Sequence, residues 1–251
     1  MRFAACFPLL LVAALGACRS DDDDREEEPA DSVRSTKIIG TNDLVPVAAD
    51  GANIPAKYRS LLDAFGRMGG CSATHIGNGL AITAGHCFGA GRTAETNLPC
   101  SRSVAWGYRK DRPAYLTSRC EVVLAAENGE RDYALFVVRP IPPVSVPIRT
   151  TRPSDGSMIT IFGHPRRRPL EWSQTCAIQP STDPASSTFR YECDTEPASS
   201  GSSVLDDTSL DVVGIHNDGT SRWNDATFIA DTPIPGLMSG EGVAPPAASA
   251  P

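Results

Sequence analysis

Residues 71–87 read CSATHIGNGLAITAGHC, and this stretch decides the fold. Two cysteines bracket it, and the second directly follows His86. Gly77-Asn78-Gly79 between two apolar runs predicts a hairpin turn, with one strand near Cys71 and another over Leu80–Thr83. A disulfide between the two cysteines would hold His86 on a fixed loop at a strand end. Taken alone, an ordinary loop histidine beside a structural disulfide explains the stretch equally well.

The composition favours one large all-β domain or two small ones, since the chain has 251 residues, 21 of them glycine and 21 proline. The run Asp21–Glu28 contributes −6 to a net charge of −7, which leaves about −1 for the rest. No strongly basic region is left for nucleic acid, so we expect no nucleic-acid partner.

The first 18 residues resemble an export signal, with Arg2 followed by the apolar core Pro8–Leu15, which is too short to span a bilayer. The signal ends in Leu15-Gly16-Ala17-Cys18, which resembles the bacterial lipobox. We therefore predict cleavage before Cys18 and lipidation of that cysteine. A plain secretory signal with an incidental cysteine is the alternative.

Six of the eight cysteines remain once Cys6 leaves with the signal and Cys18 carries lipid. An even number in an exported chain implies disulfides, and six cysteines allow about 15 pairings. We predict the sequential pairing Cys71–Cys87, Cys100–Cys120 and Cys176–Cys193. The cysteines are scattered and form no CxxC motif, so we expect no metal site.

The predicted domain boundaries follow the composition. Residues 19–37 are expected to form an acidic, disordered tether, residues 38–238 the folded domain, and residues 239–251 a disordered Ala/Pro tail. Lys37-Ile38-Ile39-Gly40-Thr41 begins the apolar part and is a plausible first strand. It is either a simple domain boundary or a processing site, and the sequence leaves both open.

Further elements are expected from periodicity. They are a short amphipathic helix over Tyr58–Met68 and strands over Ser103–Tyr108, Arg119–Ala126, Tyr133–Val138, Met158–Gly163, Ser203–Leu205 and Asp211–Ile215. Asp132 stands at the head of one of these strands, where it either caps a turn or accepts a hydrogen bond from His86. His164 follows another, and we assign it a packing role.

The order His86, Asp132, Ser200 is that of the catalytic triad on the chymotrypsin fold. Thr83-Ala84-Gly85-His86-Cys87 resembles the histidine motif of chymotrypsin-like serine proteases, and Asp132-Tyr133-Ala134-Leu135 resembles their aspartate motif. Ser200-Gly201-Ser202 resembles the serine motif of the bacterial branch that includes the glutamyl endopeptidases. Asp194-Thr195 and Val213-Gly214-Ile215-His216 also match that branch, and Ile39–Asp43 matches it more loosely.

This resemblance covers about residues 38–235 and implies an all-β fold of two antiparallel six-stranded barrels, at about 38–140 and 150–238, with the active site in the cleft between them. It implies that Ser200 is the nucleophile, His86 the general base and then acid, and Asp132 the group that orients the histidine. The N–H groups of Ala198 and Ser200 would form the oxyanion hole. No cofactor or metal is implied.

Three residues depart from the family pattern near the nucleophile. Ala198 stands where the family usually has glycine, which would be strained if the site needs a positive φ and would lower activity if the N–H turned away from the hole. Ser199 stands where the digestive branch has an aspartate that receives a new N-terminal amine, so activation at Ile38 would need other contacts. Ser203 replaces the usual proline, which we expect to be harmless.

The resemblance also places Thr195 and His216 in the primary substrate pocket, where glutamyl endopeptidases bind a substrate carboxylate. Cleavage after Glu is therefore one hypothesis. Simple packing of His216 on its strand end is the other.

The sequence as a whole predicts an extracytoplasmic, lipid-anchored serine endopeptidase of a bacterial membrane, acting as a monomer on peptide or protein substrates. Cleavage near Ile38 would release it from the membrane, and a plain secreted protein is the alternative. A catalytically weak or inactive binding module on the same fold, suggested by Ala198, is the alternative function.

Overall fold

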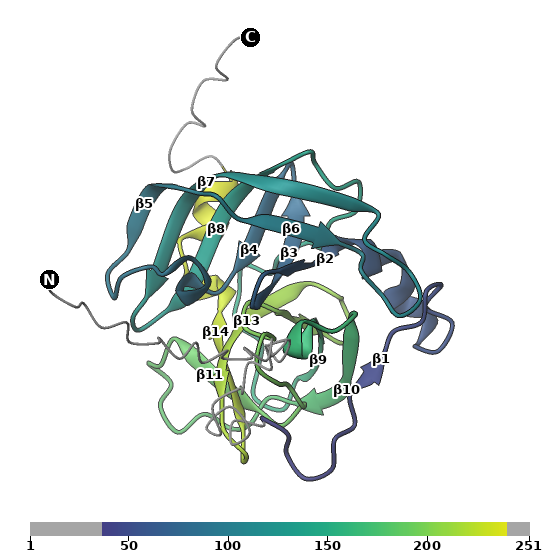
Figure 1. The fold of residues 1–251 in the computed structure, drawn as a ribbon. Helices are drawn as coiled ribbons and strands as arrows, with labels where there is room; N and C mark the ends of the chain where they lie inside the picture. Colours follow the sequence, from purple (N-terminus) through teal and green to yellow (C-terminus); the bar gives the residue numbers. More distant parts are fainter. Residues whose placement is uncertain (1–36, 240–251) are drawn as a thin grey trace, which may run out of the picture.

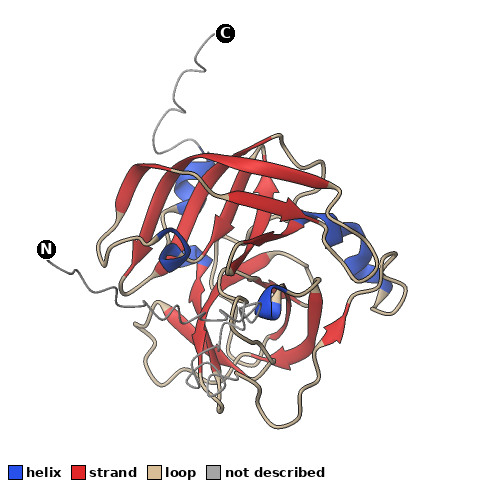
Figure 2. Cartoon of the chain, in the orientation of Figure 1, coloured by secondary structure: helices blue, strands red, loops and turns tan. Residues whose placement is uncertain are grey.

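The computed structural model describes residues 37–239. Strands dominate it, with a few short helices (Figure 2). The predicted signal, the lipidation site Cys18, the tether up to residue 36 and the tail from residue 240 lie outside the described residues. None of the helices within 37–239 has the length and apolar character needed to cross a membrane.

The elements follow one another in this order. The strands are β1 Val45–Pro46, β2 Phe65–Met68, β3 Cys71–Gly77, β4 Leu80–Thr83, β5 Glu95–Pro99, β6 Ser103–Trp106, β7 Leu116–Asn128, β8 Asp132–Arg139, β9 Met158–Gly163, β10 Glu171–Ala177, β11 Thr188–Tyr191, β12 Ser203–Asp206, β13 Val212–Gly219 and β14 Asn224–Phe228. The 3-10 helices are Ala56–Ala64, Gly85–Phe88, Pro165–Arg167 and Ile229–Asp231, and the α-helix α1 is Ile234–Ser239.

The strands form two antiparallel sheets, one above the other in Figure 1. The first has the order β5-β7-β6-β2-β3-β4-β8, and an additional β7–β8 pairing closes six of these strands into a barrel. The second has the order β1-β10-β9-β12-β13-β14-β11. Ile178, which directly follows β10, forms a bridge with Tyr191 of β11. This bridge links β10 to β11 and so closes the six strands from β9 to β14 into a second barrel. The predicted all-β fold of two antiparallel barrels is confirmed.

Each end of the described chain packs on the barrel that is farther away in sequence. Strand β1 pairs with β10 of the second barrel, although the first barrel follows it in the chain. Leu237 and Met238 of α1 pack against the core of the first barrel. These two exchanges tie the barrels together from both ends.

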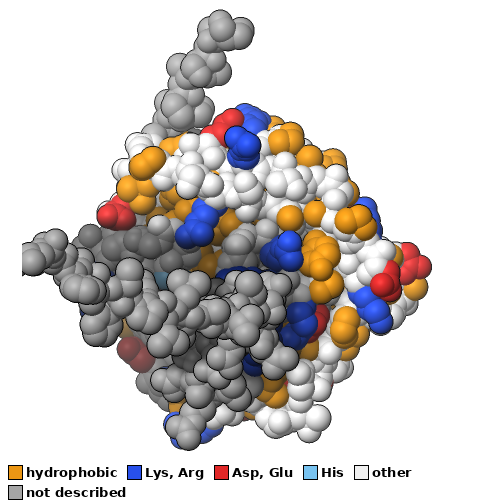
Figure 3. All heavy atoms as spheres, in the orientation of Figure 1, with side chains coloured by type: hydrophobic (Ala, Val, Ile, Leu, Met, Phe, Trp, Pro, Cys, Tyr) orange, Lys and Arg blue, Asp and Glu red, His pale blue; other side chains and the backbone are white. Residues whose placement is uncertain are grey.

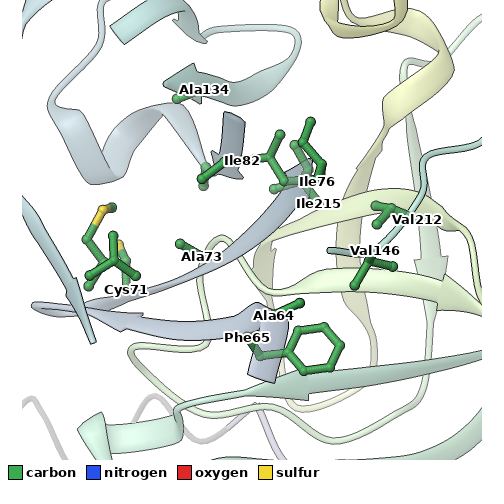
Figure 4. Packing of buried hydrophobic residues seen from close by; sticks show 14 of the residues in the cluster. Ala64, Phe65, Cys71, Ala73, Ile76, Ile82, Ala134, Val146, Val212 and Ile215 are labelled. Carbon is green, nitrogen blue, oxygen red and sulfur yellow. The ribbon is translucent and has the colours of Figure 1, made fainter. Parts of the chain in front are cut away.

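One hydrophobic cluster spans both barrels. Ile76 and Ile82 of the first barrel lie in it with Val212 and Ile215 of the second, and all four are at most 4 % exposed (Figure 4). Close-packed interiors resist sliding, so the cluster fixes the relative position of the barrels and of any side chains between them.

Two sequence expectations need correction. The predicted helix over Tyr58–Met68 holds only to Ala64, because Phe65–Met68 forms strand β2 and pairs with both β3 and β6. Periodicity did not detect this strand, because Phe65 and Met68 continue the helical spacing of Leu61 and Leu62. Lys37–Thr41 forms no strand. Lys37 makes a single bridge to Thr195 of the second barrel instead.

All three predicted disulfides are confirmed: Cys71–Cys87, Cys100–Cys120 and Cys176–Cys193. They close segments of 16, 20 and 17 residues. In the chain-entropy description each such crosslink stabilises the fold by about 3 kcal/mol.

Gly85 determines where the first barrel presents His86. A Cβ on Gly85 would lie 2.0 Å from the carbonyl oxygen of Glu127 and 2.8 Å from that of Tyr133. Both contacts are with backbone atoms, which cannot rotate away. The histidine turn therefore reaches its position only with glycine before His86.

We predict that Gly85→Ala destabilises the protein by about 3 kcal/mol, the upper part of the range for overpacking. For a chain of this size that corresponds to a fall in Tm of roughly 6–12 °C, measurable by thermal denaturation. Gly236→Ala is the control, because a Cβ there meets nothing within 4 Å. A Gly85→Ala protein as stable as that control would contradict the packing described for the turn.

Candidate active site

His86 and Asp132 make two hydrogen bonds to each other. His86 Nδ1 lies 2.6 Å from Asp132 Oδ2, and the His86 backbone N–H donates to Asp132 Oδ1 at 3.0 Å. The Asp132 N–H donates in turn to Thr227 Oγ1 of the second barrel at 3.0 Å. The carboxylate thus fixes both the ring and the backbone of His86 and leaves ring atom Nε2 for another partner.

Ser200 lies in the loop that leads into β12, and neighbouring strands hold this loop. Ser72 of β3 donates its N–H to the Ser200 carbonyl at 2.8 Å and its hydroxyl to the Ala198 carbonyl at 3.2 Å. The Gly201 N–H donates to the His216 carbonyl at 2.7 Å. The loop is therefore bonded to both barrels.

The serine cluster has one accessible member. Ser200 is partly exposed, whereas Ser199, Ser202 and Ser203 are at most 3 % exposed. Only the Ser200 hydroxyl is therefore positioned to meet a substrate, which agrees with the choice made from the sequence motif.

A cavity of about 570 Å³ brings the predicted residues together: His86, Asp132, Ala198 and Ser200 line it. The remaining lining residues are Lys37, Asn128, Gly129, Pro197, Asn217 and Asp218. Among the described residues no hydrogen bond joins Ser200 Oγ to His86. Such contacts commonly tighten only when substrate binds.

Two backbone N–H groups beside Ser200 are free of protein acceptors. Among the described residues, neither the Ala198 N–H nor the Ser200 N–H donates to a protein group. The intervening Ser199 N–H, by contrast, donates to the Glu196 carbonyl at 3.0 Å. The N–H groups of Ala198 and Ser200 are therefore available to donate to one negatively charged oxygen.

Cys71, His86 and Cys87 place potential metal-binding atoms close together within residues 37–239. The two sulfurs are already bonded to each other in a disulfide. They cannot act as thiolate ligands in this state, so the cluster does not provide a metal site.

Comparison with known proteins agrees with this geometry. The profile of the trypsin-like peptidase domain matches residues 71–215, a span that includes His86, Asp132 and Ser200. The chain belongs to the trypsin-like peptidase family. It is thus a hydrolase of the serine endopeptidase class.

Solved structures share its fold at low sequence identity. A Glu endopeptidase in complex with MPD is 18 % identical with a TM-score of 0.61, covering 81 % of this chain and 99 % of its own. The Rv3671c protease from M. tuberculosis in an inactive form is 15 % identical with a TM-score of 0.52, covering 79 % of this chain and 100 % of its own. No curated protein sequence matches the chain.

Ala198 adopts the left-handed backbone conformation that its family position suggested, with a φ of 73°. Such a φ costs an alanine on the order of 1 kcal/mol. Within residues 37–239 its N–H nevertheless has no protein acceptor.

Neither Thr195 nor His216 is among the residues that line the cavity. The Thr195 hydroxyl donates to Asn224 Oδ1 at 2.9 Å, and the residue is 1 % exposed. His216 is fully buried, and burial together with the Lys37 charge lowers its pKa to about 3. His216 is therefore neutral at physiological pH.

The proton of the His216 ring can be assigned from its neighbour. Tyr191 Oη lies 2.6 Å from His216 Nδ1, and burial raises the pKa of Tyr191 well above its usual value, so the hydroxyl keeps its proton. No other acceptor for that hydroxyl is found among the described residues, so it donates to Nδ1. Nε2 then carries the ring hydrogen, and it is a buried donor with no described partner.

Lys37 covers this part of the site and was missed by sequence reasoning as a site residue. Its carbonyl accepts from the Thr195 N–H at 3.4 Å and from Asn224 Nδ2 at 3.2 Å. Its Nζ lies 3.0 Å from Asp218 Oδ1, and Asp218 has a side chain that is 82 % exposed. The sequence marked Lys37 only as part of a domain boundary or processing site, and it indicated no site role for Asp218 or Ser72.

We predict opposite outcomes for two small residues on either side of Ser200. Gly201→Ala should abolish folding of the loop, because a Cβ there would lie 2.0 Å from Thr83 Oγ1 and 2.3 Å from the Ser72 carbonyl, at a φ of +84°. Ala198→Gly should change kcat/KM by less than about threefold, since the N–H is already free. Peptidase kinetics and thermal denaturation measure both. A gain of tenfold or more for Ala198→Gly would mean that the methyl group obstructs the hole.

Proposed function

We propose that Ser200, His86 and Asp132 act as a catalytic triad that cleaves peptide bonds through an acyl-enzyme. The observation that carries the proposal is the 2.6 Å contact between His86 Nδ1 and Asp132 Oδ2 in a cavity that Ser200 also lines. A carboxylate on Nδ1 keeps the proton there and leaves Nε2 as the base.

In the proposed reaction, Ser200 Oγ attacks the substrate carbonyl carbon while His86 Nε2 takes the hydroxyl proton. The carbonyl oxygen becomes an oxyanion, to which the N–H groups of Ala198 and Ser200 donate. His86 then passes its proton to the departing amine, and the carbon–nitrogen bond breaks. Water hydrolyses the resulting ester by the same steps, with His86 again accepting and returning a proton.

We predict that Ser200→Ala and Asp132→Asn each lower kcat/KM by about 10⁴-fold or more on an unbiased peptide library. Ser202→Ala is the matched control, because this neighbouring serine is fully buried. It should keep activity within a few-fold of the parent. Loss of activity in Ser202→Ala with Ser200→Ala still active would contradict the assignment of the nucleophile.

The alternative function is a binding module that uses the same cleft without hydrolysis, and Ala198 at a φ of 73° is the observation that favours it. Fluorophosphonate probes separate the two, because they bond only to an activated serine. Near-stoichiometric labelling of the folded protein at Ser200 supports the enzyme. Labelling that is absent in a protein with all three disulfides formed supports the binding module.

We further propose that the primary pocket prefers Glu before the cut. The Lys37 ammonium at the cavity wall would pair with the substrate carboxylate, and His216 Nε2–H behind it would donate a hydrogen bond where Lys37 shifts aside. The solved Glu endopeptidase has the same fold at 18 % identity. Lys37 already pairs with Asp218. The carboxylate of the substrate would therefore replace that of Asp218 as the partner of Lys37.

We predict that a peptide with Glu before the cut is cleaved about 10–100 times faster than its Gln counterpart, the range expected for hydrogen bonds to a charged group. Lys37→Met should reduce this ratio about tenfold, and Asp218→Asn should raise it. The ratio should stay constant from about pH 5.5 to 8, where a free Glu is ionised and His216, with a pKa of about 3, is neutral. Efficient cleavage after Lys or Leu but not Glu would remove the preference.

The location proposed for the enzyme is outside the cytoplasm, as a monomer with a lipid at Cys18. Three disulfides support export, since cytosolic thiols are kept reduced. Release by cleavage between Lys37 and Ile38 would first have to open the contacts of the Lys37 carbonyl and the Ile39 N–H, which donates to Asp194 Oδ1 at 2.8 Å. We therefore expect release by cleavage before Lys37 to leave the site intact.

A further inference from the structure

A second cavity, of about 520 Å³, lies beside the first barrel and is lined by three arginines. They are Arg67 of β2, Arg102 before β6, and Arg167 of the 3-10 helix after β9. The turn Gly69-Gly70 forms another part of its wall. Figure 3 shows Lys and Arg side chains along the middle of this face, where the two barrels meet.

Within residues 37–239 the three guanidinium groups of this cavity have no carboxylate partner. The two neighbours of Arg167 behave differently, since Arg166 and Arg168 both pair with Glu196. The cavity therefore concentrates positive charge on a chain whose net charge is −7.

Two contacts hold the side chain of Arg67. Arg67 Nη1 donates to the Arg167 carbonyl at 3.1 Å, and its guanidinium lies 4.6 Å from the centre of the Tyr108 ring. Arg167 itself has a φ of 63°, a conformation uncommon for a residue with a side chain. Strain of this kind is often found at binding sites, where it presents a particular group.

Two of the guanidinium groups converge on the Gly69-Gly70 turn. A Cβ on Gly69 would lie 3.8 Å from Arg102 Nη1, and a Cβ on Gly70 would lie 3.8 Å from Arg167 Nη2. The glycines carry no side chain into this space. The groups therefore border a common open volume, into which a carboxylate could reach both.

The arginine cavity borders the loop of Ser200. Arg67 pairs across the sheet with Ser72, which donates its N–H to the Ser200 carbonyl at 2.8 Å. The Arg166 N–H donates to the Pro197 carbonyl at 2.6 Å, which places the segment of Arg167 against the same loop. Lys37 and Asp218, the walls of the proposed primary pocket, belong to the other cavity.

We propose that Arg67, Arg102 and Arg167 bind acidic side chains of the substrate on the leaving-group side of the cleaved bond. This rests on the proposed function, since the primary pocket fixes the acyl side and a peptide crossing Ser200 must continue in the opposite direction. Arginine suits the task because its planar guanidinium pairs with a carboxylate through two parallel hydrogen bonds. The substrate class is thus a protein segment with Asp or Glu a few residues after the cut.

The first experiment measures binding without cleavage. Two fluorescent peptides share one sequence and differ only in Asp and Glu against Asn and Gln after the cut site, and both are titrated into the Ser200→Ala protein. We expect the acidic peptide to bind about tenfold more tightly, and Arg102→Gln with Arg167→Gln to remove most of that preference. The preference should fall at 1 M salt, where the Debye length is about 3 Å rather than 8 Å.

Arg222→Gln is the matched control, because this arginine is also exposed but packs on Trp223 away from the cavity. The Arg222→Gln protein should prefer the acidic peptide over the neutral one by the same factor as the protein that keeps Arg222. The acidic run Asp21–Glu28 of the chain itself could compete for the arginines, so each protein is also made with those acids replaced by Asn and Gln. Equal binding of the two peptides in this form would overturn the proposal.

The second experiment measures the ratio of kcat/KM for the same two peptides in the parent with Ser200. We expect the acidic peptide to be favoured, with the ratio reduced about tenfold in the arginine variants and unchanged in Arg222→Gln. Absence of any cleavage by the folded parent protein with its disulfides formed would count against the proposed function, whereas the binding titration would still test the arginine site. A ratio unaffected by the arginine substitutions would overturn the inference by itself.

Discussion

Ser72 is the residue through which the first barrel holds the Ser200 loop of the second, the loop that carries the proposed nucleophile. Its N–H and hydroxyl donate to the carbonyls of Ser200 and Ala198 at 2.8 and 3.2 Å. Its own carbonyl accepts from Thr83 Oγ1 at 2.7 Å, and its hydroxyl oxygen accepts from the His164 N–H at 2.9 Å. Ser72, Thr83 and His164 are at most 2 % exposed, and an unpaired polar group is costly when it is buried, so these groups keep one arrangement.

The same contacts fix the position of His86 relative to Ser200, the proposed base and nucleophile. Thr83 ends the strand that leads to His86, and the disulfide of Cys71 and Cys87 ties the residue before Ser72 to the residue after His86. The site is thus assembled at the barrel interface, where each barrel supplies part of the machinery. Catalysis by a triad depends on such positioning before substrate arrives.

Electrostatics in the cleft differ from those of the chain as a whole. The buried His164 and His216 have pKa values lowered to about 4 and about 3, chiefly by burial, and are neutral. Positive charge comes instead from Lys37 on one side of Ser200 and from the arginine cavity on the other. A net charge of −7 gave no indication of this local arrangement.

The sequence predicted the features whose determinants are adjacent in the chain. The motif around His86, the aspartate heading β8 and the three short disulfide segments are of this kind, and so is the alternation that marks the strands. Features made by distant segments could not be predicted. Lys37 reaches the site through contacts with Thr195, Asp218 and Asn224, all distant in sequence, and the arginine cavity joins residues about 100 positions apart. Strand β2 was missed for a local reason, because Phe65 and Met68 continue the helical spacing of the apolar residues before them, although the partner strand β3 begins only three residues later.

The most direct test of the account is a crystal structure of the folded protein after reaction with a fluorophosphonate. The account predicts that phosphorus is bonded to Ser200 Oγ and that its free oxygen accepts hydrogen bonds from the N–H groups of Ala198 and Ser200, with His86 Nε2 facing Oγ. An adduct on another serine, or a phosphonyl oxygen that points away from those two N–H groups, would contradict it.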